Sequence, residues 1–233
     1  MFVLGIEAAT PVASVAVATE DKILAERMVN NRRTHSVNLM PMIKETILDA
    51  GICKEQLTGI AVAKGPGSFT GLRIGMSTAR TLAQVLELPL IGVSTLEALA
   101  YSVGVQGLIC PILNARKNEL YAALYKNTGQ EQICLVPVQA INVQDLLQIL
   151  ANYEELIIFA GDALPVYANS LKEVMGKYFH LAPHCTSFPR GAAIAELGLE
   201  RLQQGTMDNP FTLLPNYARE SEAEIKWRAK MKE

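Results

Sequence analysis

The sequence lacks the cysteine spacing of a zinc site or a disulfide framework. Its four cysteines, Cys53, Cys110, Cys134 and Cys185, are scattered over 233 residues without a CxxC pair, a distribution typical of reduced thiols. It also lacks an excess of positive charge, because 21 Lys and Arg residues stand against 23 Asp and Glu residues. Phosphate contacts need clustered Lys and Arg, so this balance argues against a domain that binds nucleic acid by itself.

The N-terminal segment lacks the basic leader of a secreted protein. Residues 1–17 carry Glu7 inside their apolar stretch and alternate small and branched side chains as strands do. We therefore expect neither a signal peptide nor a membrane span, no membrane partner, and a cytoplasmic location. With 50% hydrophobic and 19% charged residues, the composition predicts a globular chain with one large core or two modest ones.

The sequence predicts the same order of elements twice. In the first half we expect three strands, a helix, a strand and a helix, at 2–8, 12–19, 22–29, 35–50, 57–63 and 70–87. In the second half the same order is expected at 108–114, 119–126, 132–136, 143–151, 155–160 and 164–175. Two βββαβα subdomains resemble the duplicated actin-like, ribonuclease H-like α/β fold of actin, hexokinase and Hsp70. We place the subdomains at 1–104 and 105–189, with 190–233 packing back on the first; a helix is expected near 190–204 and a partner-contacting tail around Trp227.

A glycine-rich loop follows the fourth predicted strand. It reads Gly65-Pro66-Gly67-Ser68-Phe69-Thr70-Gly71, with Ser68 or Thr70 available to cap the next helix. A loop that opens a helix presents free N–H groups, so Gly65, Gly67 and Ser68 are candidate contacts for a nucleotide or anion. The Gly-Lys-Ser/Thr ending of a Walker loop is absent, and Thr70 stands where GxGxxG needs its last glycine. A structural turn is therefore the stronger interpretation, and a phosphate cradle the other.

The helix after this loop carries a small-residue ridge, formed by Gly71, Gly75, Ala79 and Ala83 at four-residue spacing. Each interior glycine costs about 1 kcal/mol relative to alanine, so close packing should offset the loss. The expected neighbour is helix 35–50, whose apolar side chains surround it too widely for one buried face. Either this helix is buried in its own domain, or its surplus face docks on a second protein or a second copy. The candidate partner or dimer interface comprises His35, Leu39, Met42, Ile43, Gly71, Arg73, Gly75 and Ala79.

Several motifs together resemble the bacterial TsaB (YeaZ) family. They are His35-Ser36 with Leu39 and Pro41, the run GPGSFTGLRIG, the segment 114–121 (NARKNELY) and the segment 214–219 (LPNYAR). The resemblance implies a non-catalytic subunit for adding threonylcarbamoyl to N6 of adenosine 37 in tRNAs that read ANN codons. It implies the catalytic paralogue TsaD and the ATPase TsaE as partners and indirect contact with tRNA, and the sequence leaves open whether the free chain is a homodimer that uses the same helices. It also implies no cofactor of the chain's own, although a nucleotide at the partner interface of the assembled complex is compatible with it.

The residues needed for catalysis are missing from the expected positions. The HxxxH metal motif of catalytic relatives is incomplete, because Leu39 stands four residues after His35 where the second histidine is needed. His180 and His184 have the four-residue spacing, but Pro183 between them disfavours the regular helix that would bring the two side chains together. We therefore expect no metal site and no catalytic residue.

An actin-like ATPase also places an acidic residue on the first strand of each half. Glu7 fits that position in the first half, but Asn114 stands in the second, and Asp162 is better explained as a turn or cap residue. Arg116, in a charged hairpin, is a further candidate anion contact. The alternative function is an autonomous actin-like ATPase or small-molecule kinase.

Overall fold

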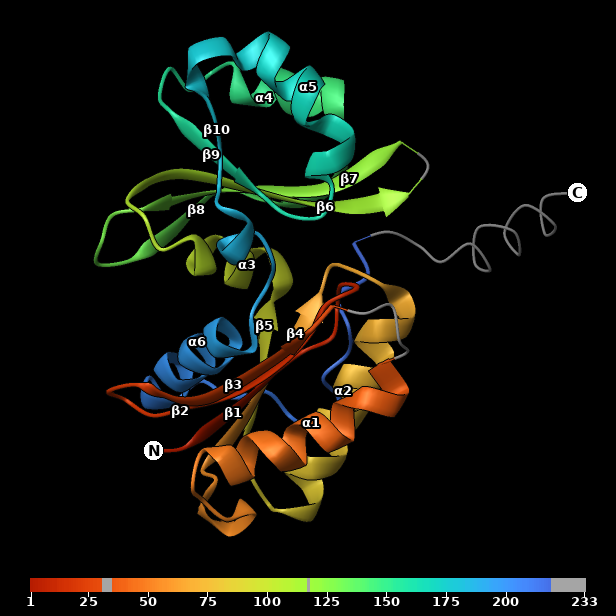
Figure 1. The fold of residues 1–233 in the computed structure, drawn as a ribbon, viewed down its shortest axis with the longest axis vertical. Helices are drawn as coiled ribbons and strands as arrows, with labels where there is room; N and C mark the ends of the chain where they lie inside the picture. The colour runs from red at the N-terminus through yellow and green to blue at the C-terminus, as the bar shows by residue number, and fades with distance from the viewer. Residues whose placement is uncertain (31–34, 117, 219–233) are drawn as a thin grey trace, which may run out of the picture.

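The computed structural model describes residues 1–30, 35–116 and 118–218. These residues form two five-stranded sheets, each with helices on both faces (Figure 1). The tail predicted to contact a partner, with Trp227, lies outside the described residues.

The first half builds its sheet in the order β3-β2-β1-β4-β5. The first three strands pair antiparallel, whereas β4 and β5 add in parallel to β1. The strands are β1 (Val3–Glu7), β2 (Ala13–Ala18), β3 (Ile23–Val29), β4 (Gly59–Gly65) and β5 (Leu90–Ser94). The helices are α1 (His35–Asp49), α2 (Phe69–Val85) and α3 (Thr95–Val103).

The second half repeats this topology, because its sheet runs β10-β9-β6-β7-β8. The strands are β6 (Gly107–Arg116), β7 (Glu119–Asn127), β8 (Gln132–Asn142), β9 (Ile157–Ala160) and β10 (Phe179–Leu181). The helices are α4 (Val143–Leu150), α5 (Leu164–Met175) and α6 (Gly191–Gln203). Short 3-10 helices occur at Lys54–Gln56, Gly176–Tyr178 and His184–Thr186.

The predicted βββαβα repeat is confirmed, but each half is longer than expected. A strand and a helix follow in both, β5 with α3 in the first and β10 with α6 in the second, where α6 is the helix expected near 190–204. The prediction omitted β5, α3 and β10. Ser94 joins β5 directly to α3, because it ends the strand and its side chain caps the helix by accepting the Glu97 N–H. No turn residue marks that junction. The structure also extends the third strand of the second half to Asn142.

The two inner helices are exchanged between the halves. α3 follows the first sheet but packs on β6 and β7 of the second, and α6 follows the second sheet but packs on β1, β2 and β4 of the first. The two helices also contact each other, so they form the middle layers between the sheets (Figure 1). The subdomain boundaries at residues 104 and 189 stay a prediction.

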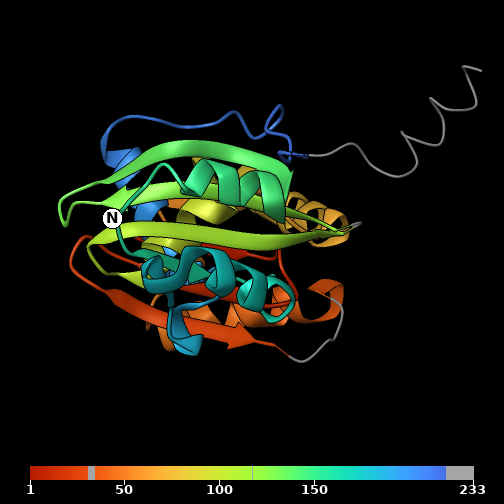
Figure 2. The same cartoon turned by 90° about the horizontal axis from the view of Figure 1, so that it is seen from above.

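The outer faces are covered by the remaining helices. α1 and α2 pack on the first sheet through a core that includes Leu4, Ile6 and Met76. α4 and α5 cover the outer face of the second sheet. In the view of Figure 2 these two helices lie in front of the strands of that sheet. No helix of the described segments is long and apolar enough to cross a bilayer.

Candidate functional site

The glycine loop closes onto the end of β1. A Cβ on Gly67 would lie 2.2 Å from the carbonyl oxygen of Ala9, and the Ser68 N–H donates to the same oxygen at 2.6 Å. Ser68 is the cap of α2, since its side chain accepts the Gly71 N–H at 3.3 Å. Only a glycine fits at position 67 because the obstacle is backbone.

This closure bears on the two interpretations of the loop. The Ser68 N–H, one of the donors that a phosphate would need, is already used by Ala9. The carbonyl oxygen of Ala8 lies against the first turn of α2, 2.0 Å from where a Gly71 Cβ would be. Because carbonyl oxygens carry partial negative charge and disfavour an anion beside them, these contacts support a structural turn. The anion contacts suggested for Gly65, Gly67 and Ser68 stay a prediction.

The small-residue ridge packs mainly on the sheet. A Gly75 Cβ would meet Ala8 Cβ at 3.2 Å and Val62 at 3.9 Å, and a Gly71 Cβ would meet the His35 ring of α1 at 3.2 Å. Helix 35–50 is also a neighbour of the ridge, as expected, because α1 contacts α2 and because Ala79 and Ala83 belong to the same core as α1. The small residues let α2 approach the end of β1 and β4 closely.

The apolar residues of α1 divide into a buried set, which includes three predicted interface residues, and a surface set. Leu39, Met42 and Ile43 are 1%, 5% and 3% exposed and belong to the core against the first sheet. Their side chains face this chain's own interior, as does Ala79 of α2. The surface of α1 instead exposes three other apolar residues, namely Val37, Met40 and Leu48. Any docking face on α1 consists of this second set.

His35 fixes the start of α1. Its Nε2 lies 2.8 Å from the Thr10 carbonyl oxygen and donates to it, while Nδ1 is buried without a partner among the described residues. Leu39, one turn on, is in the core. His180 lies in β10 and His184 in a separate 3-10 helix, and no group of three or more His, Cys, Asp or Glu residues in the described segments could hold a metal ion.

Glu7 at the end of β1 is fully buried. Its Oε1 accepts the Ala9 N–H at 2.6 Å, and Oε2 has no partner among the described residues. Burial raises the pKa of this carboxyl to about 8, against partial opposition from backbone hydrogen bonds. The side chain therefore favours its protonated form at neutral pH.

In the second half, the residues at the positions comparable to Glu7 also form structural contacts. Asp162 Oδ1 accepts the Asn114 N–H at 2.9 Å, and burial raises the pKa of Asp162. This contact fits the interpretation of Asp162 as a turn residue. Arg116 ends β6, but its side chain lies outside what the structure describes, so its anion contact stays a prediction.

A C-terminal segment lies along the first sheet and α2 through contacts that the sequence analysis did not identify. We call residues 207–218 the C-terminal strap. Asp208 pairs with β5, because its N–H donates to the Leu90 oxygen and its Oδ2 accepts the Gly92 N–H, both at 2.8 Å. Further along, the Asn216 N–H donates to the Lys64 oxygen at 2.5 Å. Spacing alone could not reveal these contacts between residues more than one hundred positions apart.

The strap also holds both arginines of α2. Arg80 donates to the carbonyl oxygens of Pro210 and Phe211, at 2.6 Å and 2.7 Å. Arg73 donates through Nε to the Tyr217 hydroxyl at 3.1 Å, and its guanidinium carbon lies 3.9 Å from the centroid of the Phe69 ring. The Tyr217 and Phe69 ring centroids are 4.5 Å apart. Arg73, predicted as an interface residue, is thus an exposed but positioned side chain.

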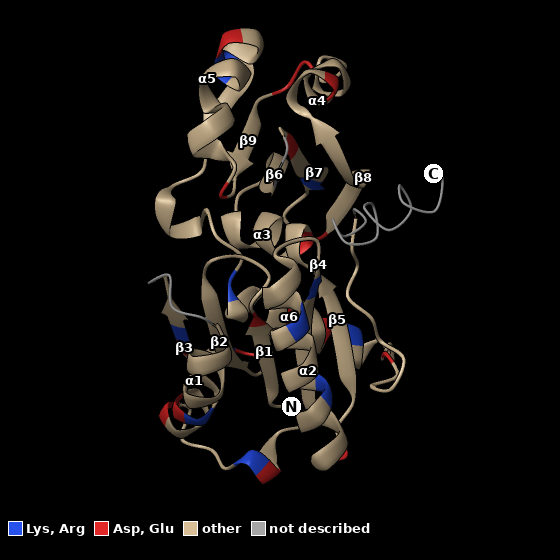
Figure 3. Cartoon of the chain, turned by 90° about the vertical axis from the view of Figure 1, so that its right-hand side faces the viewer, with Lys and Arg blue, Asp and Glu red and all other residues tan. Residues whose placement is uncertain are grey.

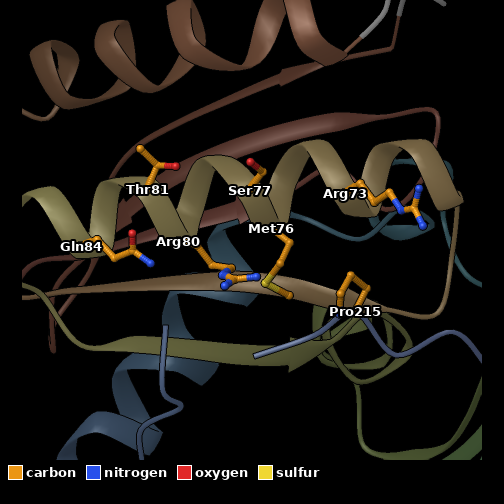
Figure 4. A pocket seen from close by; sticks show the side chains of 7 residues that line it. All are labelled: Arg73, Met76, Ser77, Arg80, Thr81, Gln84 and Pro215. Carbon is orange, nitrogen blue, oxygen red and sulfur yellow. The ribbon is translucent and has the colours of Figure 1, made fainter. Parts of the chain in front are cut away.

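A shallow pocket of about 370 Å³ opens between α2 and the strap. In Figure 4, Ser77 and Thr81 lie along one edge of α2, with Met76 and Arg80 along the other and Pro215 beside them. The lining residues are Arg73, Met76, Ser77, Arg80, Thr81, Gln84 and Pro215. Two arginines and no acidic residue therefore line it, and α2 carries blue but no red in Figure 3.

Comparisons with known proteins identify relatives whose names refer to threonylcarbamoyl modification of tRNA. Residues 22–227 match the family model described as tRNA N6-adenosine threonylcarbamoyltransferase, TsaD. The tRNA threonylcarbamoyladenosine biosynthesis protein TsaB of Bacillus subtilis strain 168 is 34% identical over 230 residues, which cover 97% of this chain and 98% of that protein.

Solved structures support the fold. YeaZ from Pseudomonas aeruginosa superposes with a TM-score of 0.77 at 21% identity, covering 93% of this chain and 99% of that one. The ROK hexokinase of Thermus thermophilus gives a TM-score of 0.50 at 11% identity, over 86% of this chain and 99% of that one, and the predicted actin-like fold is confirmed. The chain belongs to the TsaB (YeaZ) family of tRNA threonylcarbamoyladenosine biosynthesis proteins.

Proposed function

We propose that this chain is the non-catalytic subunit that binds and activates the catalytic paralogue TsaD, with the ATPase TsaE joining the pair. The assembly would transfer threonylcarbamoyl to N6 of adenosine 37 in tRNAs that read ANN codons, in the cytoplasm. The observation that carries the proposal is the closure of the glycine loop onto Ala9, beside a fully buried Glu7. A junction that uses its own donors internally is suited to packing rather than to phosphoryl transfer.

The state of Glu7 disfavours an autonomous ATPase or kinase. Phosphoryl transfer depends on charged groups that position a metal ion and the attacking group. Here the carboxyl has a pKa raised to about 8 by burial, and one of its oxygens is bound to the Ala9 N–H. A carboxyl that is fully buried and already accepts a backbone hydrogen bond is poorly placed to position a metal ion.

The outer face of α1 and α2 is the proposed docking surface. It combines exposed Val37, Met40 and Leu48, at 66%, 50% and 73%, with Arg73 of α2. Adaptable methionine among exposed apolar residues is typical of interaction sites. A second copy of the chain would compete for the same face, so a homodimer and the heterodimer would exclude each other.

The chain is proposed to need no cofactor of its own. A nucleotide in the assembled complex would lie at the partner interface, where both proteins contribute contacts. RNA would be held mainly by other subunits, because the formal net charge of this chain is −2.

Reconstitution tests the proposal. The purified chain, the paralogue and the ATPase are mixed with tRNA and threonylcarbamoyl donor, and product is measured with each protein left out in turn. We expect loss of product when this chain is omitted, and no hydrolysis of Mg-ATP by this chain alone. Full activity without it would contradict the proposed function, and ATP turnover by the isolated chain would favour the kinase alternative.

A further inference from the structure

Two arginines of α2 border the α2–strap pocket without a carboxylate partner. Neither Arg73 nor Arg80 forms an ion pair with any acidic residue of 1–30, 35–116 or 118–218. By contrast, Arg27, Arg190 and Arg201 all pair with carboxylates. Because a guanidinium keeps its charge at any physiological pH and matches carboxylate geometry, two unpaired ones at a pocket indicate an anionic occupant.

Both guanidinium groups are held in place. Arg80 is fixed by two strap carbonyl groups, and Arg73 by the Tyr217 hydroxyl and the Phe69 ring. A side chain that is already ordered loses little entropy on binding, so these arginines are prepared for a ligand. Ser77, Thr81 and Gln84 add neutral polar groups around them.

The charge pattern argues against helix α2 of a second copy of this chain as the occupant of the pocket. Residues 69–85 of α2 contain two arginines and no acidic residue, so pairing α2 with α2 about a twofold axis would bring like charges together. On the neighbouring α1, Glu45 and Asp49 already pair with Arg27, at 2.5 Å and 2.7 Å. A different protein that supplies a carboxylate fits the pocket better.

We propose that the α2–strap pocket receives an Asp or Glu side chain of the protein partner. Phe211 and Leu214 of the strap, each 70% exposed, would supply apolar contacts beside it. An acidic residue flanked by apolar ones is therefore the chemistry the surface recognises. This inference rests on the proposed function, because it names how the partner is held.

Ser77→Asp tests the proposal by placing a carboxylate of this chain itself beside the two arginines of the pocket. Position 77 is four residues after Arg73 and three before Arg80, so an aspartate there lies within reach of both guanidinium groups. The internal carboxylate would neutralise the site that the partner needs. Such pairs on a helix surface stabilise it slightly, so the melting temperature should not fall.

Binding to the purified catalytic paralogue is measured by calorimetry at about 0.05 and 0.3 M salt, where screening differs strongly. We expect Ser77→Asp to weaken binding about tenfold at the lower salt, and the difference from wild type to shrink at the higher salt. Gln130→Glu adds the same charge at an exposed turn of the second half, and should stay within about twofold of wild type.

Several results would overturn the inference. If Ser77→Asp binds as tightly as wild type, the pocket takes no carboxylate from the partner. If Ser77→Asn weakens binding as much as Ser77→Asp, bulk rather than charge is responsible. If inorganic phosphate or ADP binds the free chain and Ser77→Asp abolishes that binding, the pocket is a small-anion site instead. A wild-type chain that does not bind the paralogue at all contradicts the proposed function itself.

Discussion

The two halves share a topology, but their matching strand-to-helix junctions differ. Gly67 after β4 and Gly161 after β9 are alike, because a Cβ at either would strike a backbone carbonyl, that of Ala9 or of Ile112. Beyond the glycine, α2 begins at a serine cap and lies close to its sheet through small residues. α5 begins at Ala163 without a side-chain cap, with Pro165 in its first turn.

This difference agrees with the proposal that α2 contributes to the docking surface. α2 is held from outside by the C-terminal strap and presents two ordered arginines. In the described part of the chain no comparable segment crosses α5, whose exposed Val166 and Val174 stand singly on its surface. Under that proposal, a duplicated scaffold keeps its internal geometry in both halves while one half acquires a binding face.

The largest loss of stability is expected at Gly67 and Gly161, where both halves bring a backbone carbonyl against the glycine. Alanine at Gly67 or Gly161 would place a Cβ 2.2 Å or 1.9 Å from a carbonyl oxygen. Because backbone cannot move aside cheaply, we expect each to lower the free energy of unfolding by about 4 kcal/mol in urea titrations. Gly205→Ala is the control, since φ is +74° there but the space is open, and should cost about 1 kcal/mol. Equal losses at positions 67 and 205 would contradict the close packing.

Substitutions at the buried Met42 and the exposed Met40 of α1 should separate an effect on stability from an effect on partner binding. Met42→Glu buries a carboxylate at a site 5% exposed and should cost about 3 kcal/mol of stability. Met40→Glu, at a site 50% exposed, should leave the melting temperature unchanged and weaken binding to the paralogue. Val166→Glu on α5 provides the matched change on the other half. If it weakens binding as much as Met40→Glu, the comparison of the two helices fails.

The pH dependence of stability tests the buried acid of the first half. The folded pKa of Glu7 is about 8, above the unfolded value near 4.5. Between these values the folded state keeps a proton that the unfolded state has lost, so Glu7 makes stability fall with rising pH. The slope is at most about 1.4 kcal/mol per pH unit, giving a loss of about 2 kcal/mol from pH 5 to 7. Glu7→Gln should remove this slope, whereas an unchanged profile would show that the carboxyl is not protonated in the fold.

The smallest loss of stability is expected from a substitution in the C-terminal strap. Tyr217→Leu removes the ring contact with Phe69 and the hydroxyl that accepts from Arg73. We expect a stability loss of about 1 kcal/mol, with faster amide exchange in the first turn of α2 and none in α5. Tyr217→Phe, which keeps the ring, should recover most of the loss. Exchange that rises equally in both helices would mean that the strap does not act on α2 alone.

Local signals predicted much of the fold and less of the site. Alternating apolar residues revealed the repeated strands, and Ser68 with the glycine run revealed the start of α2. Burial was harder, because Met40 and Met42 are equally apolar and only the position of the sheet decides which one faces it. The strap contacts and the pKa of Glu7 depend on residues distant in sequence, so no local pattern could indicate them.

The exchange of α3 and α6 has a mechanical consequence. Arg201 of α6 forms two hydrogen bonds with the Glu97 carboxylate of α3, at 2.6 Å and 2.7 Å, and a third with the Gly92 oxygen at 3.0 Å. Opening a hinge between the halves would have to shear these helices past each other and expose the core beneath each. The chain should therefore unfold as one cooperative unit, and neither half should fold when produced alone.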